Sequence, residues 1–574
     1  MLRLRLENIN KVKIKAKVMD YSKLAEVYTQ LEGTTKKLEK RDIVADFFKI
    51  CPAEQLPIVA LLVQGRIFPN WAETELGVAE NIMVKTLAKT AGLPEKEIKQ
   101  EIRKFGDLGE GAEAVFEKKK QATLAYKKLT INKVYENLIK IPEQSGSGAI
   151  ELKVALLSEL LSSATPKQAK YVVRTVMQEM RVGVGEGIVR EAIALAFNVE
   201  PGLVEKAHNV TNDFGEVAKI AKKSGKAGLE KLKMELGRPL KPMLAQKAKG
   251  IEEAIKDMGG KAAFEIKFDG MRIQIHKKGD EVTVFTRRLD NVSRQFPEIV
   301  EYAKKCLKAN KCIVEGEAVG TDPKTKRPLA FQKLSRRIKR KYDIEELQKE
   351  IPVDVYLFDI MMLDGKSLVE TAFEERRKKL ESIVKGIKGK FQFADQIVTG
   401  NAKEAEKLYN KALKMGHEGV MAKNLKSPYT PGSRVKHMEK IKPEMETLDL
   451  AIIGALWGEG RRKKWMGSFV LGVKDTDRGE FVEVGKVATG LTDADLEELT
   501  KILTPNITEE HIKRVELMPK VIVEVGYEEI QRSPTYESGF ALRFPRVKTI
   551  RTDKGAEDAD TLDKVERLFN MQKK

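Results

Sequence analysis

The period of the hydrophobic pattern changes near residue 235, and this change limits the folds that are open to the chain. Before it, stretches such as KVALLSELLSSA (153–164) and IVREAIALAF (188–197) repeat apolar residues at the i, i+3, i+4, i+7 spacing of helices. From about residue 262, stretches such as VDVYLFDIMML (353–363) alternate or run apolar over the short lengths of strands. The sequence therefore predicts an all-α region followed by regions built on sheets.

Two joints divide the chain into three predicted domains. The charged, glycine-containing segment KSGKAGLEKLK (223–233) and the prolines of RPLKP soon after it end the helical region. Short strands mixed with helical stretches continue to about Pro443, and the rest of the chain holds strands and turns at regular spacing, typical of a small barrel or sandwich. We expect a multidomain α and α+β protein with domains at 1–237, 238–443 and 444–574.

Composition narrows the class of protein. The 574 residues carry 105 Lys and Arg against 85 Asp and Glu, a net charge of +20, so a polyanionic partner is expected. No apolar run approaches the roughly 18–20 residues that span a bilayer, and the N-terminus lacks the apolar stretch of a secretory signal. Three cysteines and five histidines give neither a disulfide framework nor a zinc site of usual spacing. We expect a soluble, monomeric, cytoplasmic protein without membrane contact.

A lysine in the segment EIKFDG (265–270) is the first candidate for chemistry. Lys267 stands in an alternating strand on the same side as Glu265, and the pair Asp269-Gly270 ends that strand in a tight turn. An ordinary lysine is almost wholly protonated at neutral pH, but desolvation or nearby cations lower the pKa of the amine and make it nucleophilic. Alone, the pattern is also that of an ordinary surface strand and turn.

Further charged and aromatic residues follow at strand edges. Glu317 and Glu418 lie beside glycines and offer the oxygen ligands that a divalent cation prefers. Phe358 offers a flat ring on which a base can stack. The basic residues that could bind a triphosphate are Arg272, Arg287, Lys423, Arg434, Lys440 and Lys442. Taken singly, each of these residues also fits an ordinary turn, core or surface position.

In this order, the segments resemble the nucleotidyltransferase motifs of ATP-dependent polynucleotide ligases, closest to the archaeal and eukaryotic replicative DNA ligases. The resemblance runs over nearly the whole chain. It includes 146–174 and 181–192, which are similar to the helical DNA-binding domain of that group, and RFPRVKTIRTDK (543–554), which is similar to its last motif. It implies an all-α DNA-binding domain, an α+β adenylation domain and a C-terminal OB-fold β-barrel.

The resemblance implies a reaction. Lys267, within the motif that contains Asp269, would attack the α-phosphate of ATP and carry AMP. The AMP would pass to a DNA 5′-phosphate, and a 3′-hydroxyl would displace it to seal a nick, as DNA replication, repair and recombination require. Glu265 would read the adenine and Phe358 would stack on it.

Roles follow for the remaining residues. Arg272 and Arg287 would hold the ribose and phosphates, with further ATP contacts from Lys423 and Arg434. Other implied roles are Mg²⁺ binding, with Mn²⁺ as a substitute, by Glu317 and Glu418; α-phosphate contact by Lys440 and Lys442; and pyrophosphate orientation by Arg551, Asp553 and Lys554.

One departure from the family pattern lies just before Lys440. The family often has Asn-Trp-Leu there, whereas this chain has His437-Met438-Glu439. A carboxylate beside Lys440 leaves open how phosphate contact is divided between Lys440 and Lys442.

Nicked duplex DNA is the expected partner, held through backbone and shape without regard to sequence. Two glycine-containing turns precede helices and could bind phosphate through backbone N–H groups: Ser145-Gly146-Ser147-Gly148 and 183–187. Arg174 and Arg181 lie between or beside them. A basic run at 331–341 adds Lys333, Arg336 and Arg337, and a second basic run lies at 461–464. Gln121, Leu124 and Tyr126 resemble a shortened sliding-clamp-binding box.

Three alternatives stay open at this point. A capping-type guanylyltransferase or an RNA ligase also charges a lysine in this motif, although the long helical region favours a DNA ligase. An NAD-dependent ligase would need a four-cysteine zinc site that three cysteines do not supply. A non-catalytic, basic DNA-binding scaffold would not depend on Lys267.

Overall fold

The computed structural model describes residues 18–69, 72, 74, 76–118, 128–144, 146, 148–338, 340, 342–443, 445–458, 462, 464–511 and 514–572. They form two compact units, 18–408 with Val420–Ile441 and Tyr409–Gly419 with the chain from Lys442 on. The first unit holds the helical region and nearly all of the α+β region. The second holds the β-rich C-terminal region.

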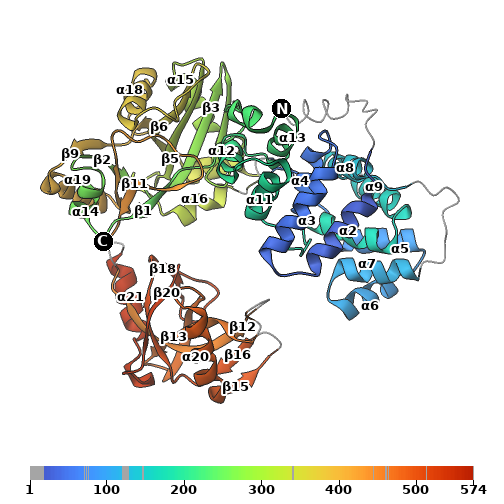
Figure 1. Cartoon of the computed structure of the whole chain (residues 1–574). Coiled ribbons are helices and arrows are strands. Elements are labelled where there is room, and N and C mark those ends of the chain that lie inside the picture. The colour runs from blue at the N-terminus through green and yellow to red at the C-terminus, as the bar shows by residue number, and fades with distance from the viewer. Residues whose placement is uncertain are drawn as a thin grey trace. The chain divides into compact units, whose positions relative to one another are not determined.

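The N-terminal part of the first unit is wholly helical where it is described, as the hydrophobic period predicts (blue to teal in Figure 1). Its α-helices are α2 (Tyr21–Glu32), α3 (Lys37–Ile50), α4 (Leu56–Leu62), α5 (Glu80–Ala91), α6 (Glu95–Phe105), α7 (Leu108–Glu117), α8 (Ile131–Lys140), α9 (Ala149–Ser162), α10 (Pro166–Met177), α11 (Glu186–Phe197), α12 (Pro201–Thr211) and α13 (Phe214–Glu230).

Local sequence sets the start of α10, and long-range packing fixes the helices together. The hydroxyl of Thr165 accepts from the N–H of Gln168 while the Gln168 side chain accepts from the N–H of Thr165, a capping box with Pro166 at the first helical position. Tyr28 on α2 is fully buried, and its hydroxyl donates to the carbonyl of Leu62 at 2.7 Å. This bond gives a buried polar group of the core a partner within the protein.

Two sheets form the α+β part of the first unit. One has the order β1 (Leu244–Lys247), β11 (Arg434–Ile441), β10 (Gly419–Lys423), β2 (Ala262–Lys267), β9 (Gln396–Thr399). The other has the order β4 (Glu281–Thr286), β3 (Met271–Lys278), β5 (Lys311–Gly320), β6 (Val353–Leu363), β7 (Lys366–Ser367), and β8 (Phe391–Phe393) pairs with β6. Strand β3 follows β2 after a short turn, so the two sheets meet at the segment 268–270.

Helices pack on both sheets of this part of the first unit. Those of this region are α14 (Ile251–Asp257), α15 (Pro297–Cys306), α16 (Phe331–Ile338), α17 (Ile344–Glu350), α18 (Phe373–Ile383) and α19 (Ala402–Lys414). The core joins Ile273 and Val355 of the sheet to Phe296 and Ile299 beside and on α15, and to Leu380 of α18. Apolar burial against a sheet face holds these helices in place.

The joint that follows the helical region is pinned to strand β3. The N–H of Leu240 donates to Oε1 of Gln274 at 2.8 Å, and the N–H of Gly237 donates to Nδ1 of His276 at 3.1 Å. Burial lowers the pKa of His276 to about 3, so its ring is neutral and able to accept this bond. The linker is thus part of the folded unit.

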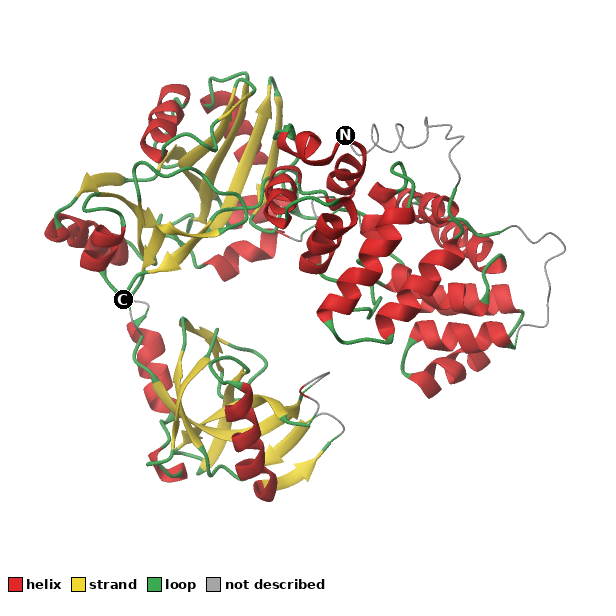
Figure 2. Cartoon of the chain, in the orientation of Figure 1, coloured by secondary structure: helices red, strands yellow, loops and turns green. Residues whose placement is uncertain are grey.

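The second unit is mostly β-structure, drawn as yellow strands in Figure 2. Its sheet has the order β14 (Glu480–Val487), β13 (Met466–Asp475), β12 (Leu448–Trp457), β16 (Arg514–Leu517), β15 (Ile507–Glu510), with β17 (Ile522–Gly526) pairing both β12 and β20 (Arg546–Arg551). A hairpin of β18 (Glu529–Arg532) and β19 (Phe540–Arg543) and helices α20 (Asp493–Leu503) and α21 (Leu562–Met571) complete it.

A hydrophobic core lies inside this unit. Phe469 and Leu471 of β13 pack with Val523 of β17 and Phe569 of α21. Across the described parts of both units, none of the helices has the length and apolarity needed to cross a membrane.

Candidate active site

Lys267 is the last residue of β2, an interior strand of the first sheet between β10 and β9. The five residues before it are buried, and Lys267 itself is half-buried, so the strand emerges from the core at this side chain. Glu265 lies two residues earlier, and the strand period of two gives both side chains the same face.

The turn after Lys267 needs a glycine. A Cβ on Gly270 would lie 2.5 Å from the carbonyl oxygen of Ala318 and 3.0 Å from Cγ of Glu317. Only a residue without a side chain permits this close approach. The turn that contains Asp269 is therefore packed against Glu317, and Glu317 stands directly opposite Arg272 in the β3–β5 pair. Three of the predicted residues are brought together in this way.

Glu265 is 2% exposed and lies in a ring of cations and amides. Its Oε2 lies 2.5 Å from Nζ of Lys423, and its Oε1 accepts from Nε2 of Gln396 at 2.8 Å and faces NH1 of Arg377 at 3.5 Å. The sequence interpretation had named Lys423 but not the other two. Gln396 stands opposite Glu265 in the β2–β9 pair, a neighbour that only the sheet topology reveals.

Phe358 on β6 presents a half-buried ring beside two predicted cations. Nζ of Lys423 lies 4.7 Å from the ring centroid, and the guanidinium carbon of Arg272 lies 5.6 Å from it. Both distances fall within the range of cation–π attraction. The ring of Phe358 and the two cations thus form one cluster of side chains.

Arg272 is anchored from several sides. Its NH2 donates to Oε2 of Glu315 at 2.6 Å, and its NH1 donates to the carbonyl of Met243 at 2.7 Å. Burial opposes the charged form, but the carboxylate of Glu315 outweighs it and raises the pKa of Arg272 above its usual range. Its Nε is buried without a hydrogen-bond partner in the described structure. Glu315 lies two residues before the predicted Glu317, but it is not one of the site residues predicted from the sequence.

Asp359, next to Phe358, forms a closed pair with Arg376 of α18. Nε and NH2 of Arg376 donate to the two carboxylate oxygens at 2.8 and 3.0 Å, and Arg376 is 0% exposed. Such a fork-to-carboxylate pair fixes the helix against the strand that carries Phe358.

The departure at Glu439 is explained by strand geometry. Lys440 on β11 is half-buried, whereas Glu439 is 5% exposed and so faces the opposite side of the sheet. Burial and the charges of Asp257 and Glu253 on α14 raise the pKa of Glu439. The carboxyl group therefore does not share a face with Lys440.

Curated relatives decide the family. The chain is 50% identical to a DNA ligase of Thermococcus fumicolans, over 97% of this chain and 99% of the relative. It is 46% identical to a DNA ligase of Methanopyrus kandleri, over 96% and 99%. This chain belongs to the ATP-dependent DNA ligase family.

Family descriptions and a solved structure agree with this assignment. The "ATP dependent DNA ligase domain" matches residues 242–442, the "DNA ligase N terminus" matches 20–194, and the "ATP dependent DNA ligase C terminal region" matches 462–554. The solved structure titled "Pmar-Lig_Pre." is 18% identical, with a TM-score of 0.55 over 92% of this chain and 99% of that one, a likeness of fold. The resemblance seen in the motifs is confirmed, and the protein is an ATP-dependent DNA ligase.

In the second unit of the ligase, two predicted residues pair with each other. Nζ of Lys442 lies 2.6 Å from Oε2 of Glu418 and 3.5 Å from Oε2 of Glu528. Among the residues that the structure describes, no three or more His, Cys, Asp and Glu side chains form a group able to hold a metal ion.

The late-motif residues of the ligase gather around one carboxylate, Asp449 of β12. NH1 of Arg551 and Nζ of Lys554 lie 3.1 and 2.6 Å from its two oxygens. Asp553 pairs with NH2 of Arg551 at 2.7 Å, and this bond lowers the pKa of Asp553 to about 2. Asp449 stands 102 residues before Arg551, and local sequence gave no sign of the contact.

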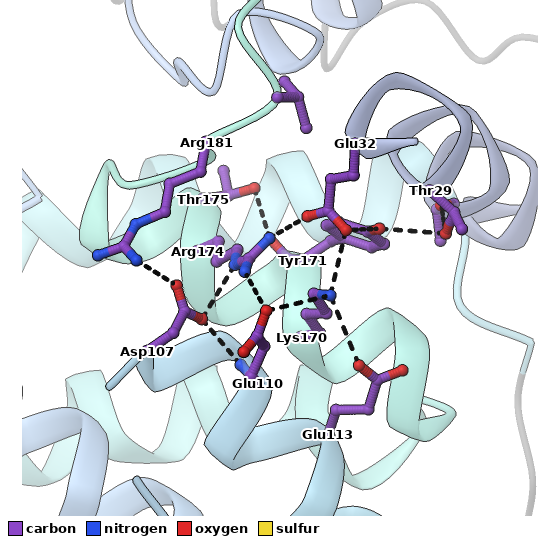
Figure 3. Close-up of polar contacts among 12 residues, drawn as sticks. Thr29, Glu32, Asp107, Glu110, Glu113, Lys170, Tyr171, Arg174, Thr175 and Arg181 are labelled. Atoms are coloured by element: carbon purple, nitrogen blue, oxygen red, sulfur yellow. Dashed lines mark hydrogen bonds and ion pairs between the residues drawn. The ribbon is translucent and has the colours of Figure 1, made fainter. Parts of the chain in front are cut away.

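One predicted DNA contact in the helical region is wrong. Arg174 is 4% exposed, and its guanidinium is held by Glu32 of α2, Asp107 before α7 and Glu110 of α7 (Figure 3). These carboxylates occupy its donors inside the helix packing. By contrast, Arg181 in the loop after α10 has an exposed side chain.

The basic run on α16 divides in the same way. Arg337 is 1% exposed, with NH1 and NH2 bonded to the two oxygens of Glu298 at 2.6 and 3.0 Å, so its predicted DNA contact is also wrong. Lys333 and Arg336 are exposed, and Arg336 pairs with Glu350 on the surface. One face of this short helix points inward and the other outward.

Two further predicted cations of the first unit are exposed. Arg287 is exposed after β4, and Arg434 is exposed on β11, where NH1 donates to the carbonyl of Ala245 at 2.7 Å. Gly146 and Gly148 both have φ of +83°. The other predicted positions lie outside the described residues: Gln121, Leu124, Tyr126, Ser145 and Ser147.

Proposed function

We propose that this ligase seals nicked duplex DNA through an AMP carried covalently on Lys267. The observation that supports the proposal is the convergence of Glu265, Lys423, Phe358 and Arg272 from four different strands. Glu265 and Lys423 lie 2.5 Å apart, and Lys423 and Arg272 flank the ring of Phe358. Lys267 lies two residues beyond Glu265 on the same strand. The adenine base could thus bind among these side chains, close to the amine of Lys267 at the end of β2.

The reaction has three balanced steps. Nζ of Lys267, once it has lost a proton, attacks the α-phosphorus of ATP, a P–N bond forms, and pyrophosphate leaves with the electrons of the broken P–O bond. An oxygen of the DNA 5′-phosphate then attacks the same phosphorus, and the amine leaves and regains a proton. Finally the 3′-hydroxyl attacks the 5′-phosphate, loses its proton, and releases AMP. Cations near phosphorus stabilise the charge that develops in each step.

The side chains around Lys267 suit the nucleotide. Glu265 would accept from the adenine amine, with its orientation set by its ion pair with Lys423, and Phe358 would stack on the ring. Arg272 would offer its unpartnered Nε–H, with Arg287 and Arg434 adding charge. Lys440 and Lys442 would contact the α-phosphate, with Asp269 orienting the turn.

Mg²⁺ fits the donor set, with Mn²⁺ as a substitute. Magnesium is usually held by one or two carboxylates together with substrate phosphates and waters. Glu317 and Glu418 would be these ligands. When bound, the ion would neutralise phosphate charge and favour the unprotonated amine of Lys267.

We assign the domains 1–237 to DNA binding, 238–443 to adenylation and 444–574 to an OB-fold. The OB assignment is supported by β12, which pairs with β13, β16 and β17 in one sheet and has register shifts against β13. Arg551, Asp553 and Lys554 would orient the leaving pyrophosphate after the ion pairs of Arg551 and Lys554 with Asp449 break.

DNA would be held by backbone groups and exposed cations. The turn at Gly146 and Gly148 and the loop that carries Arg181 precede helices, where free N–H groups favour phosphate. Lys333 and Arg336 add exposed charge, and Ser145 and Ser147 would contribute hydroxyls. None of these contacts reads a base edge, so sealing should not depend on sequence.

Further assignments complete the proposal. The ligase works as a monomer, in the cytoplasm with the nucleoid, during replication, repair and recombination. Gln121, Leu124 and Tyr126 would dock on a sliding clamp.

Labelling with [α-³²P]ATP and Mg²⁺ tests the reaction. The enzyme should gain an acid-labile, alkali-stable label, Lys267→Ala should gain none, and nicked duplex should discharge the label from the wild type. Retention of sealing by Lys267→Ala would contradict the proposal. The alternative, a guanylyltransferase or RNA ligase of the same fold, predicts labelling by GTP or discharge by nicked RNA alone.

A further inference from the structure

The loop between α10 and α11, residues 178–185, has an unusual exposed edge. Met180, Val182 and Val184 are buried, and the residues between them are exposed. The outward positions are Glu179, Arg181, Gly183 and Gly185. The edge therefore offers bare backbone next to one guanidinium, a shape that a phosphate can approach closely.

The backbone of this loop is held in a costly conformation. Gln178 and Arg181 have φ of +59° and +56°, values that side-chain-bearing residues rarely adopt. Gly183 has φ of +66°, and a Cβ there would lie 2.7 Å from Nζ of Lys40. Nζ of Lys40 donates to the carbonyl of Val182 at 2.5 Å, which anchors one side of the loop. Surrounding structure must over-determine such a conformation.

Asp107 anchors the other side, and its two oxygens do different work. Oδ1 accepts from the N–H of Glu110, which caps α7, and from Nε of Arg174 at 3.1 Å. Oδ2 lies 3.1 Å from NH1 of Arg181. Asp107 is 5% exposed, so this oxygen is a fixed acceptor (Figure 3).

We propose that Asp107 is a positioning residue for DNA binding, which holds the guanidinium of Arg181, in the exposed loop 178–185, in one orientation before DNA arrives. Pre-ordering a contact residue lowers the entropy cost of binding. The second partner of Arg181 is Glu179, at 3.1 Å and with a 59% exposed side chain. A phosphate can displace this partner while Asp107 stays in place. The inference rests on the proposed DNA contact of Arg181.

The geometry of Asp107 allows a nearly isosteric test. In Asp107→Asn the amide oxygen stays with the two donors at the Oδ1 position, and the NH₂ group then faces Arg181, where an acceptor is lost. Asparagine is also a good helix N-cap, so α7 keeps its cap. Glu179→Gln is the matched control, because it changes the exposed partner of the same guanidinium.

The experiment measures equilibrium binding of full-length enzyme to a nicked duplex over a range of salt, normalised to the fraction of enzyme that accepts AMP. Arg181→Ala should weaken binding roughly tenfold and reduce the salt slope by about one. Asp107→Asn should weaken binding roughly three- to tenfold, with no further loss in the Arg181→Ala background. Glu179→Gln should bind as the wild type or more tightly.

Three results would overturn the proposal. They are wild-type binding by Asp107→Asn, an equal loss from Asp107→Asn when Arg181 is already alanine, and an equal loss from Glu179→Gln. If Asp107→Asn does not fold, Arg181→Lys decides: it keeps the charge but loses the forked donor, so wild-type binding by it would count against positioning. Failure of the wild type to accept AMP would instead refute the proposed function.

Discussion

Two buried arginines of the first unit are neutralised in different ways. Arg376 is closed off, because its fork faces the single carboxylate of Asp359 and no exposed side chain takes part in that pair. Arg174 belongs to an open cluster, in which the carboxylate of Asp107 pairs with both Arg174 and the exposed Arg181. A closed pair fixes a helix to a strand, whereas an open cluster connects the interior to a surface that can meet a ligand.

The closed pair should be the more costly to break. Arg376→Met leaves Asp359 charged and unpartnered in the core, and we expect the free energy of unfolding to fall by about 3–5 kcal/mol. Denaturant unfolding, followed by a signal of the first unit, measures this loss. Arg376→Met with Asp359→Leu should recover most of it, since no charge is then left buried. Unchanged unfolding of the single variant would contradict the description of the pair.

The open cluster should tolerate the same change better. Glu32 and Glu110 have 24% and 41% exposed side chains, so water can solvate them when Arg174 is replaced. We expect Arg174→Met to lower the free energy of unfolding by about 1–3 kcal/mol. The variant should also lose affinity for nicked duplex, because Asp107 loses one of its fixed donors. A stability loss larger than that of Arg376→Met would reverse the comparison.

Two adjacent arginines on α16 sharpen the contrast between surface and interior. Arg336→Ala removes an exposed charge and should change the free energy of unfolding by no more than about 0.5 kcal/mol. It should weaken duplex binding a few-fold and reduce the salt slope by about one. Arg337→Ala is the matched control, since it should destabilise the fold. Equal effects of both variants on unfolding would show that this helix has no inward face.

The smallest effect concerns Glu439. Because its pKa is raised in the folded state, folding takes up protons, and stability falls as pH rises from the unfolded pKa of about 4.3 through the folded one. Glu439→Gln should therefore be slightly more stable at neutral pH and should lose this part of the pH dependence. Melting curves at pH 5 and pH 8 test it. If Glu439→Gln shows the same difference in melting temperature between pH 5 and pH 8 as the wild type, groups other than Glu439 cause the pH dependence of stability.

Strand periodicity made much of the proposed adenylation site predictable. A period of two puts Lys267 and Glu265 on one face, and it separates Lys440 from Glu439 by the same rule. The helical character of the first region followed equally from its period of 3.6. These signals are local, so one sequence suffices to read them.

Partners distant in the chain could not be predicted in this way. Glu315 and Asp359 stand close in sequence to the predicted Glu317 and Phe358. Their pairing with Arg272 and Arg376, however, depends on how strands and helices pack. Arg174 was assigned to DNA because it is basic and near a glycine turn, and only the packing of α2 and α7 shows that its donors are used inside. A basic side chain in a helix carries no local mark of its exposure.

Mapping the AMP adduct tests the central claim most directly. The enzyme is incubated with ATP and Mg²⁺, digested under alkaline conditions, and its peptides are sequenced by mass spectrometry. We predict one modified peptide, with the mass of one AMP on Lys267, and its loss after a chase with nicked duplex DNA. An adduct on Lys423 or Lys440, or one on Lys267 that nicked duplex DNA does not discharge, would contradict this account of the ligase.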